Sequence, residues 1–493
     1  MSPTLILYIV FQSLTTPQLP PAQGSTPPGQ TPGPVQGPVP AFPGTPVQKP
    51  ARVKDIAAPP PIPTPGSATG QIIGENTPLT ADESVRIALH QQPSLGLQVG
   101  AIQTQQGQTK EVGAPLHPIA TVQAGYDNVQ AIGPAASGAA SPPEAPSTLV
   151  PEGVSPVYPY SVAGAAKQLL FDFNMTRNLV NQSEALERAA EQNLTTAQLS
   201  LALNVKTDFY NYVSAIRLVH VNEENLANRQ RELDLASARY KSGVGEPSDL
   251  ATAQTSKSQG IFQLNQARDT AEHARISLLQ QMGVDPLTPV LPLDEAAPVP
   301  VGSNDAHVLT SRAIRQRPEV RGAVFALAAA KYGLSAARAT NLPALYAEVG
   351  ADLNGNGFPL TNNAANFGIG FQFPVLDGGQ REGAVRVARG QITTATSNYN
   401  TAVLQVRTDV ANAYMSLRSA EQRVVIAANE VFNAREDVRV AEGRYLIGIG
   451  LFQDITTAEQ LLLSALTDQE SARNELDLAR TQLQRATGEL LKQ

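Results

Sequence analysis

The chain has 493 residues, a formal net charge of −7, five histidines and neither cysteine nor tryptophan. The lack of cysteine excludes disulfide frameworks, zinc–thiolate sites and thiol nucleophiles, and the acidic balance gives no basic footprint for nucleic acid. The scattered histidines lack the spacing of a metal site, and no convergent acid, base or nucleophile set indicates an enzyme. We therefore expect no catalysis, no metal, no cofactor and no nucleic-acid partner.

The N-terminal residues give two predictions. Residues 1–14 contain a short apolar run that resembles a partial signal segment, without a basic start or a small-residue cleavage motif. Residues 15–70 are rich in proline, glycine, threonine and glutamine, and are predicted to form a flexible linker. No apolar run reaches the roughly 18 to 20 residues of a membrane-spanning helix, so a membrane role would have to come from strands.

The remainder of the chain is an internal duplication. Residues 88–93 correspond to 313–318, and Gly125 corresponds to Gly350, at one constant offset of 225. Further on the offset falls by about twenty, because the first repeat carries a longer loop at 133–156 that is rich in glycine, proline, alanine and serine. A long-range repeat fixes the architecture. We therefore divide the chain into a first repeat at 71–298 and a second at 299–493.

Each repeat is predicted to contain an upper helix, two strands, a long helix and a further helix. In the first repeat the upper helix covers about 81–114, with Pro93 either starting or dividing it, and the later elements lie at about 119–128, 157–171, 176–241 and 249–282. In the second repeat Pro318 has the equivalent place, and the later elements lie at about 344–353, 366–376, 381–446 and 453–489.

The long helices carry a heptad pattern. Two parallel series in the second repeat step by seven residues: Val406, Ala413, Ala420, Ala427, Ala434 and Ala441, and Val410, Leu417, Val424, Val431, Val438 and Tyr445. The first repeat has the same period at Val205, Tyr212, Val219, Leu226, Leu233 and Tyr240. Apolar heptads predict coiled-coil packing, and the alanines allow neighbouring helices to approach closely.

The strands have the alternation of membrane strands. Between Phe367 and Phe373 every other residue is aromatic or aliphatic, with glycine or glutamine between. Four strands are too few to close a barrel, since the smallest closed barrels use about eight. Several copies of the chain must therefore share one barrel, and a trimer would supply twelve strands.

Four short motifs recur in the same order in both repeats. They are a leucine and proline before the first strand (Leu116 and Pro118, Leu342 and Pro343), an aspartate after the second (Asp172, Asp377), a Thr-Asp-x-x-Asn motif in the long helix, and Arg-Tyr-x-x-Gly-x-Gly at its end. With this order and duplication, residues 79–491 resemble the TolC-like outer-membrane efflux protein family.

The resemblance implies a mainly α fold with membrane β-structure. It implies a homotrimer whose twelve-stranded β-barrel, in the outer-membrane lipid of a Gram-negative-type bacterium, is continuous with a periplasmic α-helical barrel. It also implies a passive conduit of a tripartite efflux or type I secretion system. The expected partners are a periplasmic adaptor (membrane fusion) protein and an inner-membrane pump of the RND or ABC type.

The resemblance further implies a gate at the turns that follow the long helices. Asp454 corresponds to a carboxylate that narrows the periplasmic entrance, Tyr445 and Asp249 to partners in a latch, and Ser248 to a lesser participant. The four turn glycines are expected to contact the adaptor: Gly243, Gly245, Gly448 and Gly450.

Two positions depart from the family pattern. Gly450 stands where an arginine can help the latch, and Thr457 stands where a second carboxylate can deepen the ring. The alternative role for Asp249 and Asp454 is helix capping, because both lie near predicted helix starts. For the whole chain, the alternatives are a periplasmic adaptor-like coiled-coil hairpin protein and an extended structural coiled coil.

Overall fold

The computed structural model describes residues 78–126, 160–298, 305–355, 358–373 and 375–491. All of them fall within the larger of the chain's two compact units, residues 63–493. The predicted signal segment at 1–14, the linker at 15–70 and the loop at 133–156 lie outside the described residues, as do positions 127–128 and 157–159 of the predicted strands.

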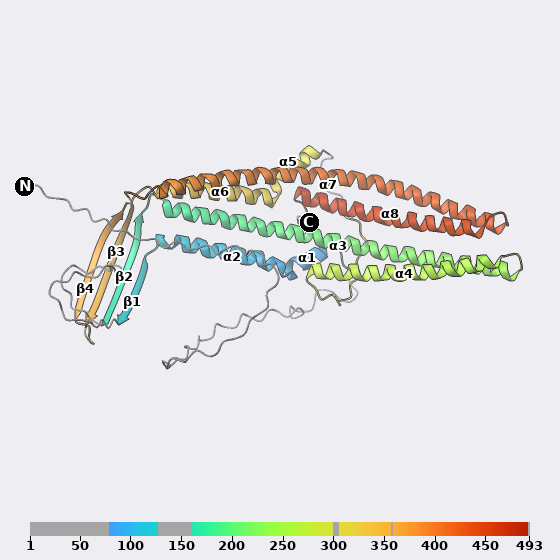
Figure 1. Cartoon of the computed structure of the whole chain (residues 1–493), viewed down its shortest axis with the longest axis horizontal. Helices are drawn as coiled ribbons and strands as arrows, with labels where there is room; N and C mark the ends of the chain where they lie inside the picture. The colour runs from blue at the N-terminus through green and yellow to red at the C-terminus, as the bar shows by residue number, and fades with distance from the viewer. Residues whose placement is uncertain (1–77, 127–159, 299–304, 356–357, 374, 492–493) are drawn as a thin grey trace, which may run out of the picture. The chain divides into compact units, whose positions relative to one another are not determined.

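Apart from one short 3-10 helix in the first, the two repeats contain the same series of elements (Figure 1). The first consists of α1 (Ala81–Gln91), α2 (Ser94–Gly113), the short 3-10 helix η1 (Ala114–Leu116), β1 (Ile119–Tyr126), β2 (Tyr160–Phe171), α3 (Met175–Lys241) and α4 (Pro247–Met282). The second consists of α5 (Ala306–Gln316), α6 (Pro318–Ala339), β3 (Ala344–Gly355), β4 (Asn362–Gln372), α7 (Gln380–Leu446) and α8 (Phe452–Thr487). None of the helices in the described part of the chain combines the length and apolarity needed to cross a membrane.

The long helices match each other in length as well as in place. Both α3 and α7 have 67 residues, and both α4 and α8 have 36. At a rise of 1.5 Å per residue, α3 and α7 each extend about 100 Å. Because each begins directly after a strand, its far end and the following turn lie about that distance from the sheet (Figure 1).

The heptad pattern of α7 is confirmed by its burial. From residue 406 onward the buried side chains are Val406, Val410, Ala413, Ala420, Ala427, Val431, Ala434, Val438, Ala441 and Tyr445. Leu417 and Val424, the other predicted members, are half-buried. The part of this stripe from Val431 to Tyr445 packs on the first half of α8 in one apolar cluster, and the part from Val406 to Ala413 packs on α5, α6 and the end of α8 in another.

The heptad prediction for α3 is only partly correct. Val205 and Tyr212 are buried, whereas Val219, Leu226 and Leu233 are half-buried and Tyr240 is exposed. In the second half of α3 the buried positions are instead Asn225, Arg229, Glu232 and Ala236. In this half α3 contacts both α4 and α8. The side chains that lie between these two helices are therefore the most buried, although three of the four are polar.

The strands form one antiparallel sheet in the order β1-β2-β3-β4. The register places Lys167 opposite Glu348, and Glu348 opposite Gly368. Because side chains alternate along a strand, the sheet has a polar face and an apolar face. The polar face carries Thr121, Gln123, Lys167, Tyr346, Glu348, Asp352, Asn366 and Gln372, and the apolar face carries Val122, Val162, Val349, Leu353, Phe367, Ile369 and Phe371.

The prediction for the fourth strand was wrong at both ends. β4 spans Asn362–Gln372, whereas the predicted strand covered about 366–376. Large apolar side chains alternate only in the second half of β4. The first half contains small and polar residues and is recognised as a strand only by its backbone pairing, with Asn362 opposite Asn354. The predicted C-terminal end included a proline at position 374, which has no N–H to donate to a neighbouring strand.

The turns from strand to long helix are built alike in both repeats. Asp172 Oδ2 accepts a hydrogen bond of 2.7 Å from the Thr176 N–H at the start of α3, and Asp377 accepts from backbone N–H groups at the start of α7. Both turns use left-handed backbone after the aspartate: Phe173 and Asn174 in one, Gly378 and Gly379 in the other. The Asp-Gly-Gly motif is therefore a strand-to-helix turn.

Candidate functional site at the hairpin turns

Each long helix ends in a turn that requires glycine. Gly243 and Gly448 have φ angles of +77° and +83°, in the left-handed region that favours residues without a side chain. A Cβ at Gly245 would lie 2.7 Å from a backbone nitrogen of α3, and one at Gly450 would lie 2.9 Å from the Arg444 side chain. Glycine therefore lets each turn fold back tightly on its own helix.

Tyr445 and Asp249 meet at these turns. Tyr445, in the last turn of α7, is 3% exposed, and its ring packs edge-on against Phe452 at the start of α8. Its hydroxyl donates a hydrogen bond of 3.0 Å to Asp249 Oδ2 in the first turn of α4. The bond therefore links the α7–α8 hairpin of the second repeat to the α3–α4 hairpin of the first.

Arg239 of α3 adds a second contact between the hairpins. Its Nη1 donates hydrogen bonds of 3.0 Å to the Tyr445 carbonyl and 3.3 Å to the Leu446 carbonyl. Its guanidinium also lies 4.6 Å from the centre of the Tyr445 ring, within the range of a cation–π interaction. These carbonyls end α7 and carry the partial negative charge of a helix C-terminus, which a cation stabilises.

Arg239 was not among the predicted site residues. The sequence held one signal for it, since Arg239 and Tyr240 align with Arg444 and Tyr445 in the other repeat. Gly450 has no side chain to reach Tyr445, and Arg239 brings a guanidinium to that tyrosine from a different helix. Only the packing of the two hairpins shows this contact.

The other predicted side chains make local contacts. Ser248 donates to Glu246 Oε2 at 3.1 Å, and Thr457 donates to the Gln453 carbonyl at 2.9 Å. Asp454 accepts from the Leu451 N–H at 3.1 Å. All three predicted residues are exposed, and these contacts lie within their own turns or helices.

The capping alternative is correct for one aspartate and wrong for the other. Asp454 bonds to the N-cap residue of α8, Leu451, which is half of a capping box. In contrast, the N-cap residue of α4 is Glu246, and Asp249 lies inside the first turn of that helix. Its carboxylate is therefore used for the contact with Tyr445.

The electrostatics of the site keep the tyrosine protonated. Burial raises the pKa of Tyr445, and the hydrogen bond and charge of Asp249 raise it further, while Arg239 opposes the shift. The hydroxyl therefore remains a donor to Asp249 at neutral pH. Within the described residues, no group of three or more histidine, aspartate or glutamate side chains is arranged to hold a metal ion.

Comparison with known proteins assigns the fold to a family. Residues 88–284 and 309–489 match the model of the outer membrane efflux protein family. The chain belongs to this family. The resemblance inferred from the repeated motifs is thus confirmed, and the family agrees with the expected location in the outer membrane.

Members of the outer membrane efflux protein family share moderate sequence identity with this chain. The outer membrane efflux protein BepC of Brucella suis is 26% identical over 57% of this chain and 62% of its own length. Protein CyaE of Bordetella pertussis is 25% identical over 60% of this chain and 64% of its own length. The alignments thus span somewhat less than two thirds of these relatives.

The solved structures show the same fold at lower identity. The structure of CusC aligns with a TM-score of 0.71 at 17% identity, and covers 83% of this chain and 92% of that chain. The arrangement of a small sheet and long helical hairpins is therefore the fold of this family. The family model and the curated relative BepC are both described as outer membrane efflux proteins.

Proposed function

We propose that this chain is one protomer of a homotrimeric outer-membrane channel, which conducts solutes passively from the periplasm to the exterior. The observation that carries the proposal is the two-faced sheet. Its strands have 8 to 12 residues, close to the length that a tilted membrane strand needs, and one face is apolar. Since four strands cannot close, three chains would together supply a barrel of twelve.

The helices would continue this barrel as a periplasmic tunnel. The exposed side chains of α7 include large apolar residues such as Met415, Ile426 and Phe432, which a neighbouring protomer would cover. The turns after α3 and α7 would then surround the periplasmic entrance, because they lie farthest from the sheet. Three copies of the exposed Asp454 would place a ring of carboxylates there, with Thr457 adding no charge.

The bond between Tyr445 and Asp249 would act as the latch of this entrance. It joins the two hairpins of one protomer, and Arg239 reinforces it by holding the end of α7. Opening requires the α7–α8 hairpin to move away from α3 and α4, which breaks these contacts. Ser248 would contribute indirectly, through its contact with Glu246 beside the α4 start.

The partners would be a periplasmic adaptor and an inner-membrane pump of the RND or ABC type, in a tripartite efflux or type I secretion system. Exposed apolar side chains at the turns, Val244, Ile447 and Ile449, offer a contact surface for the adaptor beside the four turn glycines. The adaptor-like and coiled-coil alternatives leave the strands unexplained, and the family match includes both hairpins and all four strands.

Native mass spectrometry of the detergent-extracted protein tests the shared barrel. We expect a trimer, and a monomer that needs no detergent would contradict the proposal. Ile369→Lys places a charge on the apolar face. A lysine on the lipid-facing side costs about 2–4 kcal/mol of barrel stability near the bilayer midplane, so this variant should insert poorly. Gln372→Lys on the polar face of the same strand is the matched control, and should insert normally.

A further inference from the structure

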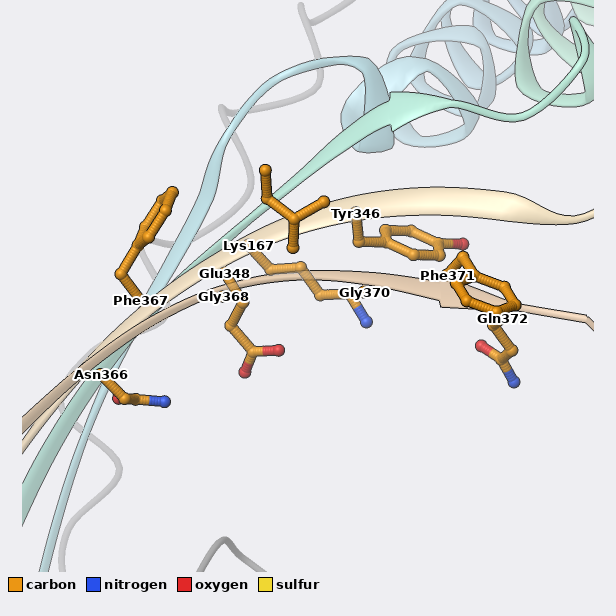
Figure 2. Close-up of a pocket in the computed structure, with 10 residues that line it drawn as sticks. Lys167, Tyr346, Glu348, Asn366, Phe367, Gly368, Gly370, Phe371 and Gln372 are labelled. Carbon is orange, nitrogen blue, oxygen red and sulfur yellow. The ribbon is translucent and has the colours of Figure 1, made fainter.

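All charged side chains of the described strands lie on one face of the sheet. They are Lys167 on β2 and Glu348 and Asp352 on β3. Lys167 and Glu348 are direct cross-strand partners, and Asp352 follows Glu348 by four residues, so the three point to the same side. Figure 2 shows Lys167 and Glu348 on the side opposite Phe367.

The polar face faces the lumen in the proposed barrel. Phe367, Ile369 and Val349 are large, apolar and exposed on the other face, which is the one suited to lipid. The charges therefore project into the aqueous pore, between low-dielectric walls that concentrate their field. This step rests on the proposed function.

The lysine is held in place and remains accessible. Its ammonium lies 4.4 Å from the centre of the ring of Tyr346, which stands two residues before Glu348 on β3. Opposite Glu348 and Tyr346, the edge strand has Gly368 and Gly370, where an added Cβ would meet nothing within 4 Å. The missing side chains leave a hollow of about 370 Å³ beside the lysine (Figure 2).

The pair lies toward the helical end of the sheet. Lys167 is four residues before the end of β2, which leads into α3, and Glu348 is four residues after the start of β3, which follows α6. Each protomer thus places one cation and one anion directly opposite each other inside the proposed barrel, on the helical side of the middle of the strands. Asp352 lies further along the barrel and has no lysine opposite it, since its partner on β2 is Ala163.

We propose that the Lys167–Glu348 pair contributes to the charge selectivity of the channel inside the barrel, in addition to the Asp454 ring proposed at the entrance. Lys167 offsets Glu348 and limits the cation preference that Glu348 and Asp352 would otherwise impose. The two partners therefore act on selectivity in opposite directions. Removal of the lysine leaves two carboxylates per protomer without an offsetting positive charge, and removal of Glu348 leaves the lysine to attract anions.

Reversal potentials of the purified trimer in planar bilayers, under a KCl gradient, test this assignment. Lys167→Gln should raise the ratio of K⁺ to Cl⁻ permeability by roughly threefold, and Glu348→Gln should lower it by a similar factor. The double substitution should return the ratio close to that of the unmodified protein. Both shifts should shrink when the salt is raised from 0.1 to 1 M, because the Debye length falls from about 10 to 3 Å.

Two variants separate charge from structure. Lys167→Arg retains the cation and should preserve the permeability ratio, whereas Gln123→Asn changes a neutral side chain on the same face and should have no effect. Open channels whose ratio stays constant in both single variants, or shifts in the same direction, would overturn the inference. A protein that forms no channel before any substitution would instead overturn the proposed function on which it rests.

Discussion

The Tyr445 hydroxyl donates to Asp249 Oδ2 across 3.0 Å, and in doing so joins residues that lie 196 positions apart in the sequence. Tyr240 holds the equivalent place at the end of α3, yet it is exposed. The duplicated chain thus uses one of two equivalent tyrosines to connect its hairpins. This asymmetry supplies a matched control for the proposed latch.

Tyr445→Phe should increase the fraction of time that the proposed channel spends open. The substitution removes one hydrogen bond to a charged acceptor, worth about 1.5–3 kcal/mol, and should therefore raise the open population by at least tenfold. Single-channel recording in planar bilayers measures this. Tyr240→Phe should leave the recordings unchanged, and equal behaviour of the two variants would remove Tyr445 from the gate.

Arg239→Ala should act in the same direction. It removes the two hydrogen bonds to the end of α7 and the contact with the Tyr445 ring, so we expect both higher conductance and a lower melting temperature. Arg444, its equivalent in the second repeat, is exposed, and Arg444→Ala is the control. If the two alanine variants melt and conduct alike, the position of Arg239 between the hairpins has no mechanical role.

The observed capping contact of Asp454 and its proposed role at the entrance can be separated by a pair of variants. Asp454→Ala removes both the charge at the entrance and the capping bond to Leu451, and should cost about 1 kcal/mol of stability. Asp454→Asn removes the charge and keeps an amide oxygen that can accept the bond. Cation selectivity should therefore fall in both variants, while thermal unfolding should show a loss mainly in the alanine variant; unaltered selectivity would leave only the capping role.

Glu232 predicts a pH-dependent stability. It is 4% exposed on α3, and burial together with the nearby charges of Glu459 and Glu442 raises its pKa to about 7, against the opposing effect of Arg229 and Arg231. Because the folded state holds this proton more tightly than the unfolded state does, stability should fall as the pH rises from about 4.5 to 7. The loss contributed by this group is on the order of 3 kcal/mol.

Glu232→Gln should flatten this pH dependence and raise the stability at pH 8. The measurement is thermal unfolding of the detergent-extracted protein at pH 5 and pH 8. Glu224→Gln changes an exposed carboxylate on the same helix and should leave the difference between the two pH values intact. A Glu232→Gln protein with an unaltered difference would show that this carboxyl does not titrate between those values.

Much of the fold could be predicted because its signals are local or repeated. The duplicated motifs located both repeats, and the heptads of α7 correspond to its buried stripe from Val406 to Tyr445. The strand alternation located the apolar face but not the start of β4. Polar residues such as Asn362 join that strand through backbone pairing, for which side-chain polarity gives no signal.

The sequence by itself determined the order of the elements, the two faces of the sheet and the glycine turns, since each depends on residues close together in the chain. Only the tertiary structure decided which side chains meet between the hairpins. Arg239 reaches Tyr445, and Glu232 lies within the electrostatic influence of Glu459, across about 200 residues. The physical reason is that α3 has neighbours on two sides, so burial there follows the packing of helices and overrides the heptad pattern.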